Sequence, residues 1–335
     1  MDSYLSNKFK ILSFISMVMV VYLHAYIPMD SENIVSIIQY YFSQEITRTA
    51  VPLFFLISGV LYFRNINNFD RSLFYSKIKR RIRSLLIPYL IFSGLGFIFV
   101  YVTQQFITTQ SYKQIANLSL SECLYTLLFQ PIGCYQLWFL RDLFILTLLS
   151  PCIYYGLKKI KVWLIFCLFI LWISGIQYII TIEAIFFFTT GAYLGCYQRR
   201  FLEYKIKSRW SILILIIWFI IALFNACHRD LYYFHCLGIL IGVCCIWLLY
   251  DLFYNKFEKY ILSWLLSYSF FIYLTHEPIL TIIKNILLAI LEKSPNSIII
   301  IYITAPIATI TLCITGGKFL KNMYNKTYLI ITGGR

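Results

Sequence analysis

Three ionisable residues of this 335-residue sequence lie inside long apolar stretches, namely His24, His276 and Glu277. An ionisable group in a membrane-spanning helix is costly, so it usually faces a water-filled cavity or a partner and marks a functional site. An imidazole titrates near neutral pH, so a histidine can serve as a general base or can itself be acylated as a nucleophile. His24 taken alone also fits a position at the membrane interface. The matched depth of His276 on a distant helix favours a shared site.

Four further polar residues are predicted at the same outer level of the membrane, where each lies near the outer end of an apolar stretch: Arg48, Arg141, Asp142 and Glu183. Arg48 also fits an interfacial anchor, and one member of the pair Arg141 and Asp142 also fits a side chain that snorkels outward. Adjacent helical residues point about 100° apart, so we expect no close pairing between Arg141 and Asp142.

The sequence predicts no metal site. The ten cysteines show no paired or metal-ligand spacing. His228 and His235 lie in or beside a predicted outer loop, where we expect both to be solvated.

A dense basic cluster precedes the Pro88-Tyr89 pair and contains Lys77, Arg80, Arg81 and Arg83. Such a cluster fixes the orientation of a membrane protein by keeping its loop in the cytoplasm, and this role alone would explain it. Guanidinium and ammonium groups also bind phosphates, so the same residues fit a site for a cytosolic nucleotide or coenzyme A.

The composition indicates an integral membrane protein. Hydrophobic residues make up 60% of the chain, charged residues 13%, and the mean hydropathy is +0.76, against about 25% charged residues in soluble domains. Apolar runs near 20 residues long are typical of spanning helices. The sequence therefore predicts one all-α domain over 1–335, a polytopic bundle with segments 34–47 and 115–130 outside the membrane. About ten spanning helices are expected, at 9–28, 48–64, 84–104, 137–156, 162–180, 181–198, 210–226, 234–252, 263–284 and 296–316.

Basic residues occur in alternate connections between the predicted spans, which are 64–83, 158–161, 199–209, 256–259 and the tail from 318. Lysine and arginine concentrate in cytoplasmic loops, so this alternation predicts that both termini are cytoplasmic. It also explains the net charge of +15 without a nucleic-acid partner.

Five segments, in this order, carry a resemblance to a known family: VVYLHA at 20–25, RTAVPLFFLISG at 48–59, KIKRRIRSLLIPY at 77–89, LWFLRDL at 137–143 and YSFFIYLTHEP at 268–278. The chain resembles the integral membrane acyltransferases of the acyltransferase-3 type, which include bacterial polysaccharide O-acetyltransferases. Many members carry an arginine eleven residues before the first-helix histidine. That position is Ser13 here, and Lys10, one turn earlier, is a candidate to supply the charge.

The resemblance implies transfer of an acyl group, usually acetyl, from cytosolic acyl-CoA to a hydroxyl of a cell-surface glycan or glycolipid, at the inner (plasma) membrane of a bacterium. Acetyl-CoA would be a substrate, and no bound cofactor is expected. The implied partners are the acyl-CoA, the glycan or lipid-linked glycan and membrane lipids.

The same resemblance suggests a role for each candidate residue. His24, His276 and Glu277 would be catalytic; Arg48, Trp138, Arg141 and Asp142 would bind the substrate; Lys77, Arg80, Arg81 and Arg83 would bind acyl-CoA. Transfer through direct attack and transfer through an acylated His24 both remain open. A transporter or flippase is the alternative, because intramembrane His, Glu and Asp also suit proton relays, although no repeated half with broken helices is evident.

Overall fold

The computed structural model describes residues 3–30, 33–64, 66, 68–106, 114–176, 180–204, 208–261 and 263–334. Over these residues the chain is a bundle of helices without a β-strand, as the sequence predicts. The helices are α1 (Ser3–His24), α2 (Ile34–Tyr40), η1 (Tyr41–Ile46), η2 (Thr47–Thr49), α3 (Ala50–Phe63), α4 (Arg71–Arg81), η3 (Ile82–Leu86), α5 (Ile87–Gln104), η4 (Ile115–Asn117), α6 (Leu120–Leu128), η5 (Tyr135–Leu137), α7 (Trp138–Leu148), α8 (Ser150–Ile160), α9 (Val162–Ile173), α10 (Ile182–Tyr197), α11 (Arg199–Glu203), α12 (Ser208–Cys227), α13 (Tyr232–Tyr260), α14 (Ser263–Leu266), α15 (Ser269–Leu291), α16 (Pro295–Met323) and α17 (Asn325–Ile331).

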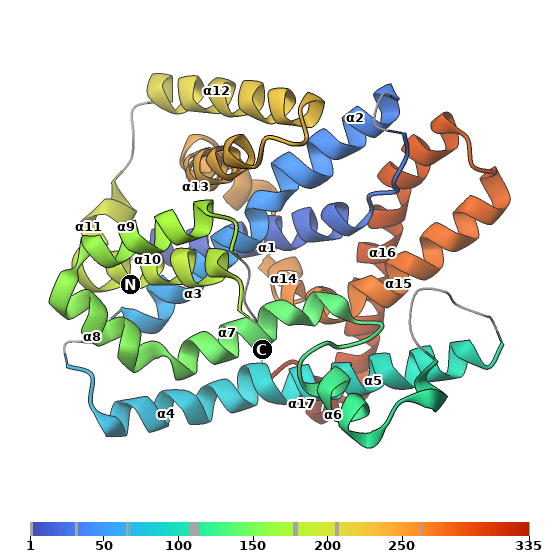
Figure 1. Ribbon diagram of the computed structural model, residues 1–335, viewed down its shortest axis with the longest axis horizontal. Coiled ribbons are helices and arrows are strands. Elements are labelled where there is room, and N and C mark those ends of the chain that lie inside the picture. The colour runs from blue at the N-terminus through green and yellow to red at the C-terminus, as the bar shows by residue number, and fades with distance from the viewer. Residues whose placement is uncertain are drawn as a thin grey trace.

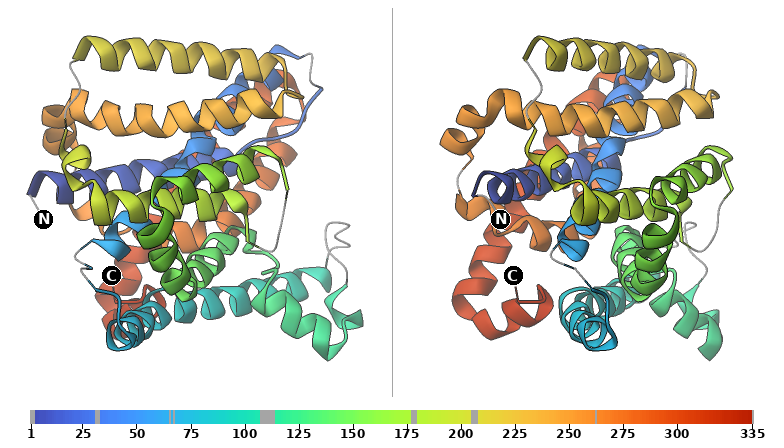
Figure 2. Two further views of the ribbon diagram at one scale, coloured as in Figure 1. Left: turned by 60° about the vertical axis from the view of Figure 1, so that its left-hand side comes forward. Right: turned by 90° about the vertical axis from the view of Figure 1, so that its left-hand side faces the viewer.

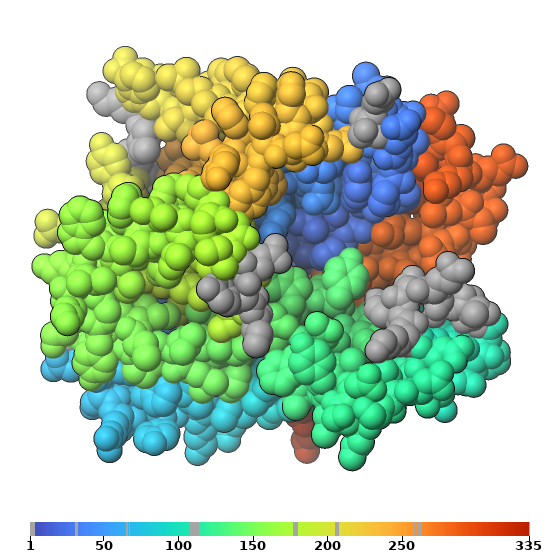
Figure 3. Space-filling view, in the orientation of Figure 1, coloured from blue at the N-terminus to red at the C-terminus, as the bar shows by residue number. Residues whose placement is uncertain are grey.

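The helix α1 runs through the middle of the bundle. Helices α12 and α13 lie along one edge and the long α4–α5 unit along the opposite edge, with α15 and α16 beside α1 (Figures 1 and 2). On the face shown in Figure 3, green and orange segments cover most of the blue N-terminal segments. The blue segments are visible between them and at the upper right. The central position of α1 places His24 where several helices meet.

Seven helices of the described chain are long and apolar enough to cross a membrane, or eight if a bent pair counts as one span. This supports a multi-pass membrane protein but not the count of ten, and the departures lie in the fourth to sixth predicted spans. The fourth is bent by 60° between Leu148 and Ser150, where Pro151 near the start of α8 cannot continue the preceding helix. The predicted fifth span yields only the twelve-residue α9, and residues 177–179 of that span lie outside the described chain.

Two segments expected outside the spans, 34–47 and the basic connection 64–83, largely continue the helices of the neighbouring spans. Residues Ile34–Phe63 form one continuous helical unit, wound as a π-helix in η1 and as a 3-10 helix in η2. The basic connection is likewise mostly helix, because α4, η3 and α5 are continuous over Arg71–Gln104. The π-helical turn of η3 leads directly to Pro88, which lacks an N–H to donate. In contrast, 115–130 forms only short helices, as expected outside a span.

Glycines hold α3 against α10 at backbone distance. A Cβ on Gly59 would overlap the Phe188 carbonyl oxygen, and a Cβ on Gly191 would overlap that of Leu56. Small residues allow helices in a membrane to approach this closely and gain dispersion energy. The sequence motif that contains Gly59 therefore has a packing function. This packing fixes α3, which carries several residues of the candidate site.

We predict that Gly191→Ala lowers thermal stability, because overpacking a close helix contact costs typically about 1–3 kcal/mol. The control is Gly94→Ala in α5, where an added Cβ meets no atom within 4 Å and alanine favours the helix. Thermal unfolding of the two detergent-purified variants measures the difference. Equal melting temperatures would show that the α3–α10 contact does not depend on glycine.

Candidate active site

His24 is the last residue of α1, and two side chains from distant parts of the sequence hold it. Its Nδ1 lies 2.9 Å from the hydroxyl of Tyr135. Its carbonyl oxygen, which has no partner within the helix because α1 ends there, accepts a 2.7 Å hydrogen bond from Lys284 Nζ. The position of the imidazole is therefore fixed from both its ring and its backbone.

His276 is fully buried in α15, and its ring stacks on that of His24 with centroids 5.6 Å apart and 29° between the planes. Its Nδ1 lies 3.1 Å from the carbonyl oxygen of Ile272 and 2.9 Å from that of Tyr273. Carbonyl oxygens only accept, so Nδ1 must carry a proton. In the neutral imidazole this leaves the lone pair on Nε2, which is buried without a hydrogen-bond partner among the described residues.

Glu277 brings a carboxylate to the same place. It is 4% exposed, its Oε1 accepts a 3.1 Å hydrogen bond from Thr281, and it hydrogen-bonds the Tyr135 hydroxyl. The ammonium of Lys284 lies close enough to attract it. With Glu277 ionised, Tyr135 donates its single proton to the carboxylate and accepts from His24 Nδ1. The lone pair of His24 is then on Nε2.

A cavity of about 20 Å³ adjoins His24 and is lined by Val20, His24, Val51, Phe54, Gln136, Trp138, Phe139 and Tyr273. A larger cavity of about 230 Å³ shares Phe54, Phe139 and Tyr273 with it and extends to Ser13 and Arg81. Because three aromatic residues line both cavities, the two cavities are adjacent, with Arg81 on one and His24 on the other, and we refer to the pair as the path. This path brings one member of the basic cluster, the predicted Trp138 and the predicted His24 into a single feature.

The structure divides the basic cluster into inward and outward groups. Arg81 lines the path, and Lys77 donates a 2.6 Å hydrogen bond to the Tyr62 carbonyl oxygen while its ammonium lies 4.5 Å from the Tyr62 ring centroid. Arg80 and Arg83 are exposed. Lys10 is exposed as well and does not line the path, so the cation beside Ser13 is Arg81 and not Lys10.

The remaining predicted polar residues are engaged in pairs outside the two cavities of the path. Arg48 Nη2 lies 3.5 Å from Glu183 Oε1. Arg141 Nη2 lies 2.8 Å from Asp142 Oδ1, so the expectation that these neighbours would not pair was wrong. The expectation considered only the directions of the two Cα–Cβ bonds. The arginine side chain is long enough to fold back along the helix and reach the neighbouring carboxylate.

The Arg141–Asp142 pair supports the segment that carries Tyr135. Arg141 Nη1 donates to the carbonyl oxygen of Phe129, just after α6, and Asp142 Oδ2 accepts from the backbone N–H of Thr181 at 3.3 Å. Helix α6 itself is tied to α5, since Tyr89 donates to the Leu128 carbonyl oxygen at 2.8 Å. The pair therefore positions the loop before η5, in which Tyr135 lies.

The predicted solvation of the two outer histidines holds for one of them. His228 is exposed, but His235 Nδ1 lies 2.9 Å from Oε1 of the buried Glu45. The Asn225 amide donates to the other oxygen of Glu45 at 2.9 Å. The prediction for His235 was wrong because α13 begins at Tyr232 and turns this residue toward η1.

Other reactive groups near the site are inert or absent in the described chain. Burial raises the pKa of the Cys134 thiol to about 12, with the nearby Glu277 charge as a further cause, so Cys134 stays protonated at neutral pH. Within the described ranges no three His, Cys, Asp or Glu side chains gather closely enough to hold a metal ion. The titratable side chains that gather here are His24, His276, Glu277, Tyr135 and Lys284.

Comparison with known families identifies the chain over most of its length. A family model described as an acyltransferase domain matches residues 8–317. The chain belongs to the acyltransferase-3 family. No curated protein and no solved structure matches the chain. The matched range of this acyltransferase includes α1 with His24, the basic α4 and α15 with His276 and Glu277.

Sequence reasoning missed Tyr135 and Lys284. Lys284 is seven residues after Glu277, which places both on one face of α15 two turns apart. That spacing is a signal that the sequence offered. Tyr135 is one tyrosine among 28, and it follows a segment without regular structure, so no pattern singled it out.

We predict that Tyr135→Phe lowers kcat for acyl transfer by about 10–100-fold, the loss that follows from removing a hydrogen bond to a charged group. The donor KM should change far less, because Tyr135 orients His24 and lies outside the residues around Arg81. Steady-state kinetics of detergent-purified protein measures both constants. Tyr233→Phe, which alters an exposed tyrosine, is the control, and equal kcat values in the two variants would contradict the role given to Tyr135.

Proposed function

We propose that this acyltransferase moves an acetyl group from cytosolic acetyl-CoA to a hydroxyl of a cell-surface glycan or glycolipid in the plasma membrane of a bacterium. The observation that carries the proposal is the path from Arg81 to His24 through Phe54, Phe139 and Tyr273. It has a cation at the end that bears the basic cluster and an imidazole at the other end. A donor with a phosphate head and a long arm that ends in a thioester matches this order of groups.

The lining of the path suits the arm and the acyl group of such a donor. The wider cavity combines apolar side chains with Ser13, Ser58 and Arg81, and it narrows from about 230 Å³ to about 20 Å³ beside His24. The narrow end has room for about one water-sized group. This size favours acetyl over longer acyl chains.

His24 is the base in the proposed chemistry. Its Nε2 takes the proton of the acceptor hydroxyl while the hydroxyl oxygen attacks the thioester carbonyl carbon. The carbon–sulfur bond then breaks, and the proton passes to the leaving CoA thiolate. Tyr135 and Glu277 hold the tautomer that leaves Nε2 unprotonated, and the positive charge of Lys284 lies beside them.

The acceptor side of the proposal uses residues around the narrow end of the path. Trp138 lines that cavity beside His24 and offers an aromatic surface to a sugar ring. The charge of Arg48 acts on His24, so Arg48 lies near the cavity beside His24. Arg141 and Asp142 would contribute indirectly, by holding the segment that bears Tyr135.

We predict that His24→Ala lowers the acetyl-transfer rate by about 10²–10⁴-fold, the usual effect of losing a general base. His276→Ala should cost less, because His276 lies on the far side of the stacked pair and does not line the cavity beside His24. Transfer from radiolabelled acetyl-CoA to extracted surface glycan, by variants of matched monodispersity, gives the rates. The control is His228→Ala, which removes an exposed histidine.

Wild-type turnover by His24→Ala would remove the base from this mechanism. Loss of activity in His276→Ala that equals the loss in His24→Ala would instead make the two imidazoles one catalytic unit. Failure of the wild-type protein to use any acyl-CoA would contradict the proposed donor.

We predict that Arg81→Gln raises the KM for acetyl-CoA by about tenfold, the equivalent of one charge-assisted hydrogen bond. Arg80→Gln is the matched control, because Arg80 is the neighbouring arginine and points away from the path. The difference between them should persist at high salt, because salt screens the exposed charge of Arg80 more than the partly buried charge of Arg81. Equal KM values for the two variants would leave the cluster with only its topological role.

A further inference from the structure

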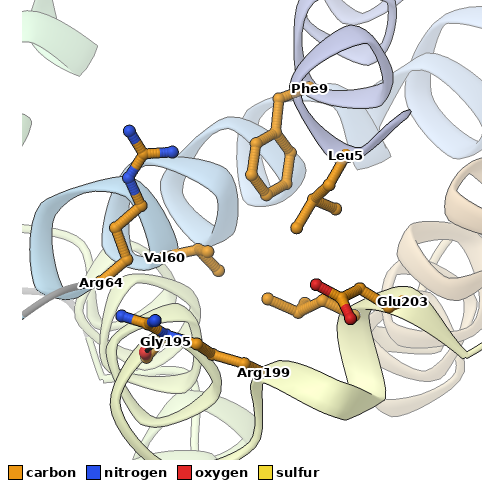
Figure 4. Close-up of a pocket in the computed structure, with 8 residues that line it drawn as sticks. Leu5, Phe9, Val60, Arg64, Gly195, Arg199 and Glu203 are labelled. Atoms are coloured by element: carbon orange, nitrogen blue, oxygen red, sulfur yellow. Dashed lines mark hydrogen bonds between the residues drawn. The ribbon is translucent and has the colours of Figure 1, made fainter. Parts of the chain in front are cut away.

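A third pocket, of about 120 Å³, lies apart from the path, between α1, α3, α10 and α11 (Figure 4). It is lined by Leu5, Phe9, Val60, Arg64, Gly195, Arg199, Leu202 and Glu203. None of these residues lines either cavity of the path. The pocket is therefore a separate feature at the end of the bundle where the basic connections lie.

The charge of this pocket is positive. Arg64 follows the end of α3 and Arg199 begins α11, while Glu203 is the one acidic residue of the lining. In Figure 4 both guanidinium groups lie on the same side of the pocket, and the Glu203 carboxylate lies across from them. Two guanidiniums on one side form the donor array that a phosphate group accepts.

Helix packing fixes the relative position of the two arginines. A Cβ on Gly195 would lie 2.9 Å from the Val60 carbonyl oxygen and 3.3 Å from the Arg64 backbone nitrogen. Arg199 Nε donates a 3.1 Å hydrogen bond to the Gly195 carbonyl oxygen, which draws its side chain back to the same contact. The backbones that carry the two arginines thus pack closely at one junction.

The pocket is also electrostatically continuous with the basic cluster of α4. The charge of Arg64 acts on Lys77 together with those of Arg80 and Arg81. Arg64 therefore lies near enough to the basic cluster for the charges of the pocket and of the cluster to act on one another. An anion bound there would relieve the repulsion between these cations.

We infer that this pocket binds a phosphate monoester and, resting on the proposed function, that the ligand is the phosphate on the nucleotide ribose of the acyl-CoA donor. Phe9 precedes His24 by fifteen residues on α1, which is roughly 22 Å along the helix. The nucleotide is the end of the donor farthest from the thioester, so it has to bind at such a distance from His24. Leu5 and Phe9 provide an apolar wall beside the phosphate site for the adjoining base.

The kinetic test compares acetyl-CoA with acetyl-dephospho-CoA, which lacks only that phosphate. We expect the wild-type KM to be about tenfold lower for acetyl-CoA, the equivalent of one charge-assisted contact. In the double variant Arg64→Gln/Arg199→Gln, the ratio of the two KM values should fall toward one. Arg200→Gln, which neutralises the exposed neighbour of Arg199 outside the pocket, should keep the wild-type ratio. An unchanged ratio in the double variant would overturn the inference.

A binding test separates this inference from the proposed function. Calorimetry with adenosine 3′,5′-bisphosphate should show binding to the wild-type protein and at least tenfold weaker binding to the double variant, whether or not acyl transfer is detected. Equal binding to both proteins would overturn the site. Inorganic phosphate or proteoliposomes rich in anionic lipid, added as competitors, test the other sources of phosphate. The wild-type protein could lose its preference for acetyl-CoA over acetyl-dephospho-CoA only when anionic lipid is present. That result would assign the pocket to a lipid headgroup and overturn the nucleotide assignment.

Discussion

The arrangement of this protein depends on the cost of leaving an ionisable group unpartnered among apolar helices. Lys8 is 1% exposed and pairs with Asp251, the buried Glu45 pairs with His235, and Arg48 pairs with Glu183. Each pair joins elements that are distant in sequence, so charge pairing and helix packing select the same fold. Among the described residues, His276 Nε2 and Glu277 Oε2 are both buried without a hydrogen-bond partner, so two polar atoms of the candidate site remain unengaged by the protein.

The glycine contact between α3 and α10 links this electrostatic constraint to the path. Helix α3 contributes Val51 and Phe54 beside His24, Ile57 and Leu61 farther along, and Arg64 at its end. Because Gly59 and Gly191 hold α3 and α10 at backbone distance, these residues lie on a rigid wall. The residues of α3 that line the two cavities of the path and the third pocket thereby keep constant positions along one wall, as the proposed long-armed donor would require.

The sequence by itself determined the class of the protein and predicted that His24, His276 and Glu277 lie at one level of the bundle. Apolar runs predict spanning helices because the bilayer penalises any other arrangement of the backbone. The depth of a residue follows from its count along such a run, so the meeting of His24 with His276 and Glu277 was predictable. Helix ends were less predictable. Helix α2 is a short, mostly apolar helix and α4 a basic one, and both continue neighbouring helices through π-helical turns that no sequence pattern marks.

Only the tertiary structure decided which side chains touch. Depth does not give the rotation of a helix about its axis, so the sequence could not separate the inward Arg81 from the outward Arg80 or show that Arg141 folds back onto Asp142. The roles of Tyr135 and Lys284 depend on contacts across more than 100 positions of sequence. Such contacts are set by the packing of many helices at once, because each bundle geometry offers different partners to the same buried polar group.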